Sequence, residues 1–387
     1  MASSDTSSVA LPGALGAGDR GGRALTVMQL LPALESGGAE RSTLEIARAL
    51  VAAGHRSIVV SAGGRMVAQL QAEGSEHVTL DIGRKSLATP ARIVPLRRLI
   101  RERHADIVHA RSRLPAWLAR VAVRGTGAHF VTTMHGLNSP GRYSSVMVRG
   151  ERVILVSHAV RDFVLSHYPW VDQSRLLVIP RGVDPEEFPY GHAPEPEWVE
   201  HFEQEYPALR GAPLLTLPGR GTRLKGHADA IKLHADLLSR GVDTRLLLLG
   251  IVEAGREAYV EEMRALAASR KVADTVVFSP QRSDVREVLA HSALVLQLST
   301  YPESFGRTVV EALALCRPVL GYAHGGVGAL LAELYPAGRV QPGNAERLVE
   351  RAAELLRLAP PIQPLKEYTL EAMQTAVLEV YRELAGS

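Results

Sequence analysis

Short segments rich in Val, Ile and Leu alternate with amphipathic segments along almost the whole chain, and they fall into two series. Strands that alternate with helices form parallel sheets covered by helices, so each series predicts one doubly wound α/β domain. In the first series we predict strands at residues 24–31, 57–61, 77–80, 106–110, 129–133, 152–157 and 176–180. In the second series we predict strands at residues 213–219, 244–250, 275–279, 293–299 and 317–322.

A segment rich in Pro and Gly, residues 181–197, separates the two series and shows no helical period, so we predict a linker there. The predicted domains are therefore an N-terminal domain at residues 23–185 and a C-terminal domain at residues 186–365. A last helical pattern lies within residues 366–387. Residues 1–22 are rich in Ser, Gly and Ala and lack a basic start, so we expect a disordered extension and not a signal peptide.

The composition, with 46% hydrophobic and 22% charged residues, is that of ordinary globular domains. No apolar run approaches the roughly 20 residues that a membrane-spanning helix needs. The single cysteine, Cys316, excludes an internal disulfide framework and a cysteine-based zinc site. These features favour a cytoplasmic location.

Positive charge is concentrated in residues 84–124, where eleven Lys or Arg face only Glu102 and Asp106, although the net charge of the whole chain is +3. The helical pattern in this segment puts Leu96 and Ile100 on one side and arginines on the other. Two interpretations stay open: a solvated face of an arginine-rich protein, or a patch that faces anionic lipid or an anionic acceptor. Nucleic acid is not expected as a partner, because no aromatic residues interleave with the charges.

A glycine-rich loop with two cations, Arg220 and Lys225, follows the first predicted strand of the second series. Ligands of doubly wound sheets bind outside the carboxyl ends of the strands, which is where this loop lies. Glycines allow a close approach to the backbone, and two cations suit a phosphate or diphosphate. The spacing of a P-loop is absent. The alternative interpretation is that Arg220 and Lys225 are ordinary surface cations that bind no ligand.

Two glutamates, Glu303 and Glu311, stand eight residues apart in "PESFGRTVVEA", where a helix is predicted to begin. The amides of Gly306, Arg307 and Thr308 at that helix start favour an anion. Glu303 is placed to cap the helix, but the carboxylate of Glu311 lies too far along it for that task. We therefore expect Glu311 to face a cation or a polyol such as a ribose diol.

Two weaker signals lie in the first series. Gly37 and Gly38 form a predicted strand-to-helix turn at residues 36–40, before a helix predicted at 41–54. His135 stands at a strand end beside Gly136, where a structural histidine is the alternative to a functional one.

Together these segments resemble the retaining family-4 glycosyltransferases, over nearly the whole chain from about Leu25. The segments that carry the resemblance are Gly-Gly-Ala-Glu at 37–40, His-Gly at 135–136, "VSHAV" at 156–160, "GVD" at 182–184, Arg-x4-Lys-Gly at 220–226, E-x7-E at 303–311 and Gly-Gly at 325–326. The resemblance implies the GT-B fold, in which two doubly wound Rossmann-like domains face a cleft and the C-terminal helix crosses back to the first domain.

The resemblance also implies roles for the charged residues. Glu303 would contact hydroxyls of the donor sugar, and Glu311 would contact the ribose diol. Arg220 and Lys225 would hold the donor diphosphate and neutralise it as it leaves. His135 would lie near the transferred sugar.

Further contacts to the nucleotide sugar are implied by the same resemblance. Amides at residues 305–308 would support the diphosphate, the glycine turn would let the first domain close on the phosphate, and the loop 279–284 would border the base through its backbone. The residues concerned are Gly37, Gly38, Gln281, Arg282, Phe305, Gly306, Arg307 and Thr308. The chain departs from the family at Arg181, where Asn is frequent.

The implied function is a retaining glycosyltransferase that moves a hexose-type sugar to a saccharide or lipid-linked acceptor in the synthesis of a bacterial surface glycan such as lipopolysaccharide. We expect no cofactor and no metal, and a UDP-sugar is favoured over a GDP-sugar as the donor. The basic segment raises the alternative of a peripheral location on the cytoplasmic membrane. Two further readings stay open: a nucleotide-sugar 2-epimerase of related fold, and a catalytically silent nucleotide-sugar-binding protein.

Overall fold

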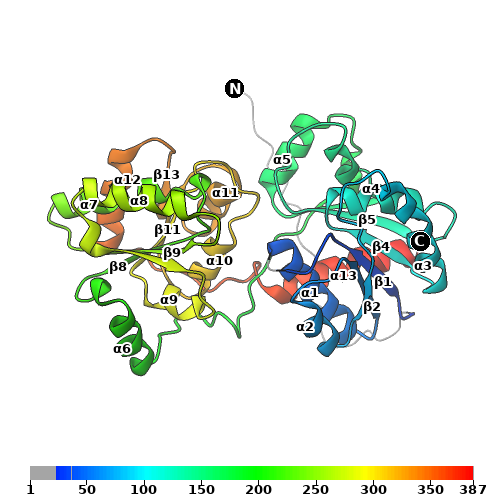
Figure 1. Cartoon of the computed structure of the whole chain (residues 1–387), viewed down its shortest axis with the longest axis horizontal. Coiled ribbons are helices and arrows are strands. Elements are labelled where there is room, and N and C mark those ends of the chain that lie inside the picture. The colour runs from blue at the N-terminus through cyan, green and yellow to red at the C-terminus, as the bar shows by residue number, and fades with distance from the viewer. Residues whose placement is uncertain (1–22, 36, 387) are drawn as a thin grey trace.

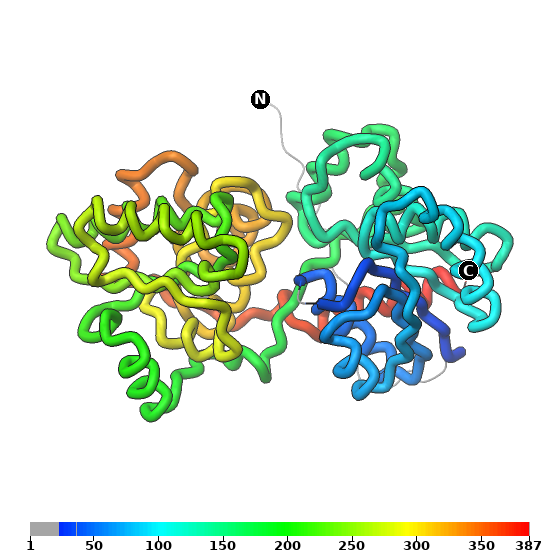
Figure 2. The backbone as a smooth tube through the Cα atoms, viewed as in Figure 1, coloured from blue at the N-terminus to red at the C-terminus, as the bar shows by residue number. Residues whose placement is uncertain are grey.

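The computed structural model describes residues 23–35 and 37–386, which form two α/β domains side by side (Figure 1). The extension predicted at residues 1–22 lies outside the described residues. Figure 2 shows the chain passing from the first domain to the second and returning at its C-terminal end.

The first domain is built on a parallel sheet of seven strands in the order β3-β2-β1-β4-β5-β6-β7. Its strands are β1 (Thr26–Leu30), β2 (Arg56–Ser61), β3 (Glu76–Thr79), β4 (Ile107–Ala110), β5 (His129–Met134), β6 (Arg152–Leu155) and β7 (Leu176–Val178). Its helices are α1 (Gly38–Ala52), α2 (Val67–Ala72), α3 (Ile93–Glu102), α4 (Arg113–Ala122) and α5 (His158–His167). Helices α3 and α4 share one apolar core with the sheet, and α1 lies in a different core against its other face.

The second domain repeats this plan with six parallel strands in the order β10-β9-β8-β11-β12-β13. Its strands are β8 (Leu214–Pro218), β9 (Arg245–Val252), β10 (Val276–Pro280), β11 (Leu294–Gln297), β12 (Val319–Tyr322) and β13 (Arg339–Val340). Its helices are α6 (Pro196–Glu205), α7 (His227–Ser239), α8 (Glu257–Ser269), α9 (Val285–His291), α10 (Arg307–Ala314), α11 (Gly325–Leu334) and α12 (Ala345–Arg357).

Both sheets reverse their strand order at one point, between β1 and β4 in the first domain and between β8 and β11 in the second. Chain segments that leave the carboxyl ends of these strands diverge to opposite faces of the sheet and leave a crevice. The loop with Arg220 and Lys225 leaves β8, and the segment with Glu303 follows β11. The strand order therefore brings these two parts of the sequence to the same crevice.

Two chain segments cross between the domains, and they run side by side. The amide of Val183 donates to the carbonyl of Tyr368 (2.9 Å), and the amide of Leu370 donates to the carbonyl of Val183 (2.8 Å). A Cβ atom on Gly182 would lie 2.0 Å from the carbonyl oxygen of Thr369, so a larger residue would force the two segments apart. This close approach explains the glycine of the "GVD" segment.

The last helix, α13 (Leu370–Gly386), packs on the first domain, which confirms the predicted GT-B arrangement (Figure 1). Tyr381 is fully buried, and its hydroxyl lies 2.6 Å from His109 Nδ1 on β4. The other ring nitrogen of His109 lies 2.7 Å from Thr133 Oγ1 on β5. The helix is therefore attached to the first sheet by a buried polar contact as well as by apolar packing.

The structure differs from the sequence prediction at several elements. Helix α1 begins at Gly38 and not at Arg41: Gly37 is its N-cap in extended conformation, a position that glycine favours. The two-residue strand β13 is too short for a pattern to reveal it. Among the residues described, no helix is long and apolar enough to cross a membrane.

Replacing Tyr381 with Phe is expected to lower the free energy of unfolding by about 1–3 kcal/mol, because it leaves the buried ring of His109 without one hydrogen-bond partner. Thermal or urea denaturation followed by circular dichroism measures this difference. Tyr301→Phe is the matched control, since Tyr301 is 57% exposed, and its effect should stay within about 0.5 kcal/mol. Equal stability of the two variants would contradict the assigned role of the hydroxyl.

Candidate functional site

An ion pair joins the two loops that meet at the crevice of the second domain. Lys225 Nζ lies 2.6 Å from Glu303 Oε1, and both side chains remain partly exposed, at 28% and 22%. Glu303 also accepts hydrogen bonds from Ser299 Oγ and, at 3.3 Å, from Gln297 Nε2. The structure therefore brings together two of the predicted site residues and fixes the carboxylate with two polar residues that the sequence analysis did not identify.

Glu303 does not cap the helix that follows it. Helix α10 begins at Arg307, and its N-cap is Gly306, with φ 103° and no side-chain cap. Its first amide groups are thus free of a side-chain cap and carry the partial positive charge of a helix start. Only the backbone of Phe305 can serve a ligand here, because its side chain is buried.

The segment around Glu303 is held against the first domain. Ser304 Oγ donates to the carbonyl oxygen of His135 (2.8 Å), and Ser157 Oγ donates to the carbonyl oxygen of Ser304 (2.5 Å). Ser157 also caps helix α5 by accepting from the amide of Val160. His135, which follows β5, is thereby placed beside the Glu303 segment and across the cleft from the crevice of the second domain.

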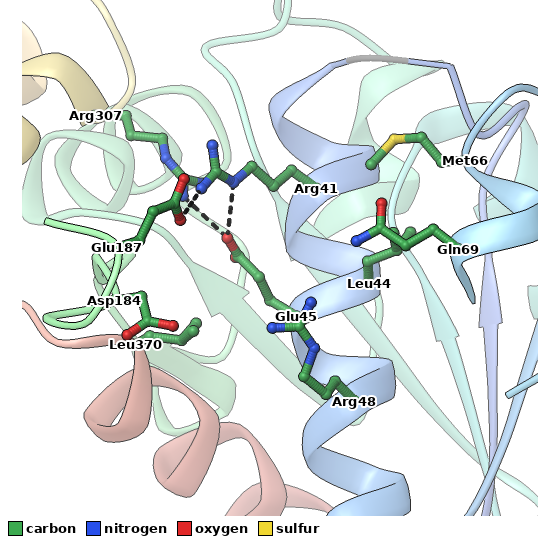
Figure 3. A pocket seen from close by; sticks show the side chains of 10 residues that line it. All are labelled: Arg41, Leu44, Glu45, Arg48, Met66, Gln69, Asp184, Glu187, Arg307 and Leu370. Carbon is green, nitrogen blue, oxygen red and sulfur yellow. Dashed lines mark hydrogen bonds and ion pairs between the residues drawn. The ribbon is translucent and has the colours of Figure 1, made fainter. Parts of the chain in front are cut away.

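Glu311 is buried and faces a cation. Its Oε1 atom lies 2.9 Å from Arg307 Nε, and the Nη2 atom of the same arginine lies 3.0 Å from Glu45 Oε1 on α1. This acid–arginine–acid chain connects the two domains, and Figure 3 shows its contact between Arg307 and Glu45. Neither Glu45 nor the side chain of Arg307 was identified from the sequence as a contact between domains.

A pocket of about 350 Å³ lies beside this contact, between α1, α2 and the crossing segments. Figure 3 shows the side chains that line it, which are Arg41, Leu44, Glu45, Arg48, Met66, Gln69, Asp184, Glu187, Arg307 and Leu370. Arg41 pairs with Glu187 and with Glu45, so much of the charge in this pocket is already neutralised within the protein.

The remaining predicted residues are spread around the cleft. Arg220 is exposed, and its guanidinium makes no hydrogen bond or ion pair with any described residue. Gly37 and Gly38 lie at the start of α1, where Gly37 is beside the side chain of Glu40 and Gly38 is beside that of Arg181. No described contact links Arg220 to Glu303.

The loop after β10 carries Gln281, which is exposed, and Arg282. The guanidinium of Arg282 lies 2.8 Å from Asp284 and 2.8 Å from Glu205, and these hydrogen bonds raise its pKa above the usual range. The side chain of Arg282 is therefore engaged within the protein, whereas Gln281 of the same loop is exposed.

His135 and Arg181 form a polar contact at the edge of the first domain. Arg181 Nη2 lies 2.8 Å from His135 Nδ1. Burial, together with the charges of Arg181 and Arg111, holds the pKa of His135 well below its usual range. The sequence analysis identified His135 as a candidate and noted Arg181 as a departure from the family pattern, but it did not predict their contact.

The described residues contain no group of three or more His, Cys, Asp or Glu side chains arranged to hold a metal ion. The site is thus composed of a helix start, cations from both domains, two acids and a neutral histidine. Such an arrangement can bind an anionic group beside a polyol.

Two sequence profiles match the chain, one for each domain. The profile of Glycosyltransferase Family 4 matches residues 36–187, and that of Glycosyl transferases group 1 matches residues 200–371. The D-inositol 3-phosphate glycosyltransferase of Acidothermus cellulolyticus is 28% identical over 244 residues, which are 57% of this chain and 53% of the relative. The match therefore spans about half the length of that curated relative.

Solved structures share the whole architecture. A glycosyltransferase from Rickettsia africae has a TM-score of 0.83 at 28% identity, over 93% of this chain and 98% of that one. HepE from Anabaena, solved in complex with UDP and glucose, has a TM-score of 0.75 at 19% identity, over 93% of this chain and all of HepE. At that identity, the likeness to HepE shows the fold alone.

The two facing Rossmann-like domains and the returning helix define a protein of the GT-B class. The two profile matches then show that the chain belongs to the family-4 glycosyltransferases.

Removing the contact between Glu45 and Arg307 is expected to destabilise the protein in a coupled way. Glu45→Gln and Arg307→Met should each lower the free energy of unfolding by about 1–3 kcal/mol, because each leaves a buried charge with one partner fewer. The double variant should be more stable than the sum predicts, with a coupling of about 1 kcal/mol or more, measured by a double-mutant cycle in urea.

The pair Arg41–Glu187 provides the control for this cycle. It lies in the same pocket, but its side chains are 39% and 47% exposed, so its coupling should stay below about 1 kcal/mol. Additive effects for Glu45 and Arg307 would show that their contact does not connect the domains in solution.

Proposed function

We propose that this chain is a retaining glycosyltransferase that moves a hexose-type sugar from a UDP-sugar to a saccharide or lipid-linked acceptor of a bacterial surface glycan. The observation that carries the proposal is the pairing of Lys225 with Glu303 at the strand-order reversal, beside His135 of the other domain. This arrangement puts a cation and an acid of the second domain next to a segment that contacts the backbone of His135 in the first domain.

The donor diphosphate would lie between the start of α10 and the loop after β8. Lys225 and Arg220 supply two cations, and the uncapped amides at residues 306–308 supply hydrogen-bond donors. Arg220 is exposed and pairs with no acid in the part of the chain that the structure describes, which leaves its charge available for a ligand. UDP is the favoured nucleotide, and the complex of HepE with UDP and glucose supports this choice on the level of the shared fold.

The sugar and the ribose would lie on either side of the diphosphate. Glu303 is oriented by Ser299 and Gln297 and would accept hydrogen bonds from sugar hydroxyls. Glu311 would accept from the ribose diol through the oxygen atom that Arg307 does not occupy. The two acids thus have different environments that match different roles.

The chemistry that we propose needs no covalent intermediate. The bond between the anomeric carbon and the diphosphate oxygen breaks, and a bond forms between that carbon and the acceptor hydroxyl on the same face. The leaving phosphate accepts the proton of that hydroxyl. Lys225, Arg220 and the amides of α10 stabilise the negative charge that develops on the diphosphate, which is the main task of such a site. A metal ion has no step in this proposal.

The acceptor is proposed to approach along the first domain, which carries the basic segment. On that segment Leu87 is fully exposed and Val94 is 72% exposed, and Arg84, Lys85 and Arg92 are exposed near them. Apolar side chains among cations are typical of a surface that lies on anionic lipid. This geometry supports a peripheral location on the cytoplasmic membrane as part of the proposal.

Other cations of residues 84–124 are buried or bind groups within the protein. Arg111 is buried, Arg97 donates to the carbonyls of Val121 and Ala122, and Arg103 pairs with Glu76. The surface charge is therefore smaller than the sequence count suggests.

Purified protein incubated with UDP-sugars and GDP-sugars should release UDP when an acceptor is supplied, and the product should keep the anomeric configuration of the donor. The acceptors should include a small phosphorylated polyol, because a matched relative is named for inositol 3-phosphate. Lys225→Ala and Arg220→Ala should each weaken UDP binding by about 10- to 100-fold, as the loss of one charge-assisted bond implies. Isothermal titration calorimetry measures this affinity.

Arg240→Ala is the matched control, since Arg240 is an exposed arginine of the same domain at the end of α7. Its UDP affinity should equal that of the unmodified protein. Epimerised sugar nucleotide without transfer would identify an epimerase and refute the proposal. UDP binding without any turnover would identify a silent binding protein.

Association with vesicles that contain anionic lipid should be strong at low salt and weak at high salt, because exposed cations are screened. Exchanging both Arg84 and Lys85 for Glu should weaken the association with vesicles by about tenfold or more, because each basic residue contributes roughly 1 kcal/mol to binding at an anionic surface. Vesicle co-sedimentation measures the bound fraction. The same double exchange at the exposed Arg240 and Arg270 of the second domain is the control, and equal losses would remove the specific role of the segment.

A further inference from the structure

Arg181 is a buried cation without an acidic partner. It lies in the crossing segment after β7 and is only 9% exposed. No carboxylate of the described residues lies within ion-pair distance of its guanidinium. Its one hydrogen-bond partner is the Nδ1 atom of His135 at 2.8 Å, and its Nε atom is buried without a partner.

The chemistry of this contact determines where the ring of His135 carries its proton. Burial and the nearby Arg307 lower the pKa of Arg181 to about 10, so the guanidinium remains charged at neutral pH. A guanidinium has five N–H donors and no acceptor. The Nδ1 atom of His135 must therefore accept, and the proton of a neutral ring must sit on Nε2.

The surroundings of His135 keep the ring neutral. Burial is the largest cause of its lowered pKa, followed by the charges of Arg181, Arg111 and His109. Arg181 reaches the ring from the crossing segment, whereas His109 and Arg111 belong to β4 and its carboxyl end. The second domain contributes Ser304, which contacts the carbonyl oxygen of His135 and not its ring. No carboxylate of the described residues contacts the ring.

The Nε2 atom of His135 is buried and has no partner among the described residues. A buried N–H group without an acceptor costs about 1–3 kcal/mol, so such groups are rare unless a ligand completes them. Its neighbour Ser304 is adjacent to Glu303, the acid proposed for the sugar hydroxyls. The geometry thus leaves one unsatisfied donor on the first-domain side of the sugar position.

We propose that Arg181 is a positioning residue for the transfer reaction: it holds His135 as the neutral Nε2–H tautomer, so that His135 offers a hydrogen-bond donor to an oxygen atom of the substrate. This inference rests on the proposed function for its substrate, but the tautomer itself is independent of it. It also assigns a task to the arginine that departs from the family pattern.

The tautomer has a mechanistic consequence. A ring with its proton on Nε2 and its Nδ1 atom engaged by a cation has no free lone pair to act as a base. His135 is then a hydrogen-bond donor during the reaction, and the acceptor proton goes to the leaving phosphate. Lysine also only donates, so Arg181→Lys should keep part of this arrangement, whereas Arg181→Met should remove it.

Nitrogen-15 NMR of histidine-labelled protein tests the tautomer directly, with the His135 signals assigned by their loss in His135→Gln. The unmodified protein should show an unprotonated Nδ1 and a protonated Nε2 from about pH 8 down to about pH 6, below the ordinary histidine value. In Arg181→Met the pKa of His135 should rise, because one neighbouring positive charge is gone, and Nδ1–H signals should appear. Arg48→Met, on an arginine of α1 that pairs with Glu73, is the control and should leave the His135 signals unchanged.

Kinetics supply the second measurement. Arg181→Met should lower kcat for UDP release by about 10- to 100-fold while the affinity for UDP changes by less than about twofold, and Arg181→Lys should recover part of the loss. A protonated Nδ1 in the unmodified protein, or identical His135 signals in Arg181→Met, would overturn the inference even if a variant is too unstable for kinetics. Absence of UDP release from every nucleotide sugar would refute the proposed function alone, because the NMR result does not depend on turnover.

Discussion

The segment from Glu303 to Phe305 is the point on which the arrangement of both domains depends. Ser304 accepts a hydrogen bond from Ser157 and donates one to the carbonyl of His135, so this residue of the second domain is held against the first by two hydrogen bonds. The same few residues place Glu303 beside Lys225 and precede the uncapped start of α10. A shift of this segment would therefore disturb the cleft, the acid and the helix start together.

Some arginines around the cleft have acidic partners among the described residues, and others do not. Arg307 is bound by Glu45 and Glu311 and connects the domains. Arg282 is bound by Asp284 and Glu205. Arg220 and Arg181, in contrast, have no acidic partner within residues 23–35 and 37–386. Buried or clustered charges that lack a partner inside the protein are the ones most available to a ligand. This contrast separates the arginines that are neutralised within the protein from Arg220, which we assign to the donor, and from Arg181, which we assign to the positioning of His135.

Much of the fold and part of the site could be predicted from the sequence. The alternation of strands and helices predicted two parallel sheets, and the principle that ligands bind at the carboxyl ends of strands drew attention to the segments of Lys225 and Glu303. The contact of Glu45 with Arg307 could not be predicted, because 262 positions separate the two residues and their meeting depends on how the domains face each other. The contact of Arg181 with His135 could not be predicted either, because His135 follows one strand and Arg181 lies in the crossing segment after another.

The sequence by itself determined the local elements: hydrophobic periodicity selects strands and helices, and glycines such as Gly182 mark places where two backbones approach closely. It also determined which residue types are present for chemistry. Only the tertiary structure decided which of the many arginines are neutralised and which are free, and which nitrogen of His135 carries a proton. The physical reason is that hydrogen bonds and ion pairs act over a few ångströms, so their partners are set by packing and domain orientation and not by distance along the chain.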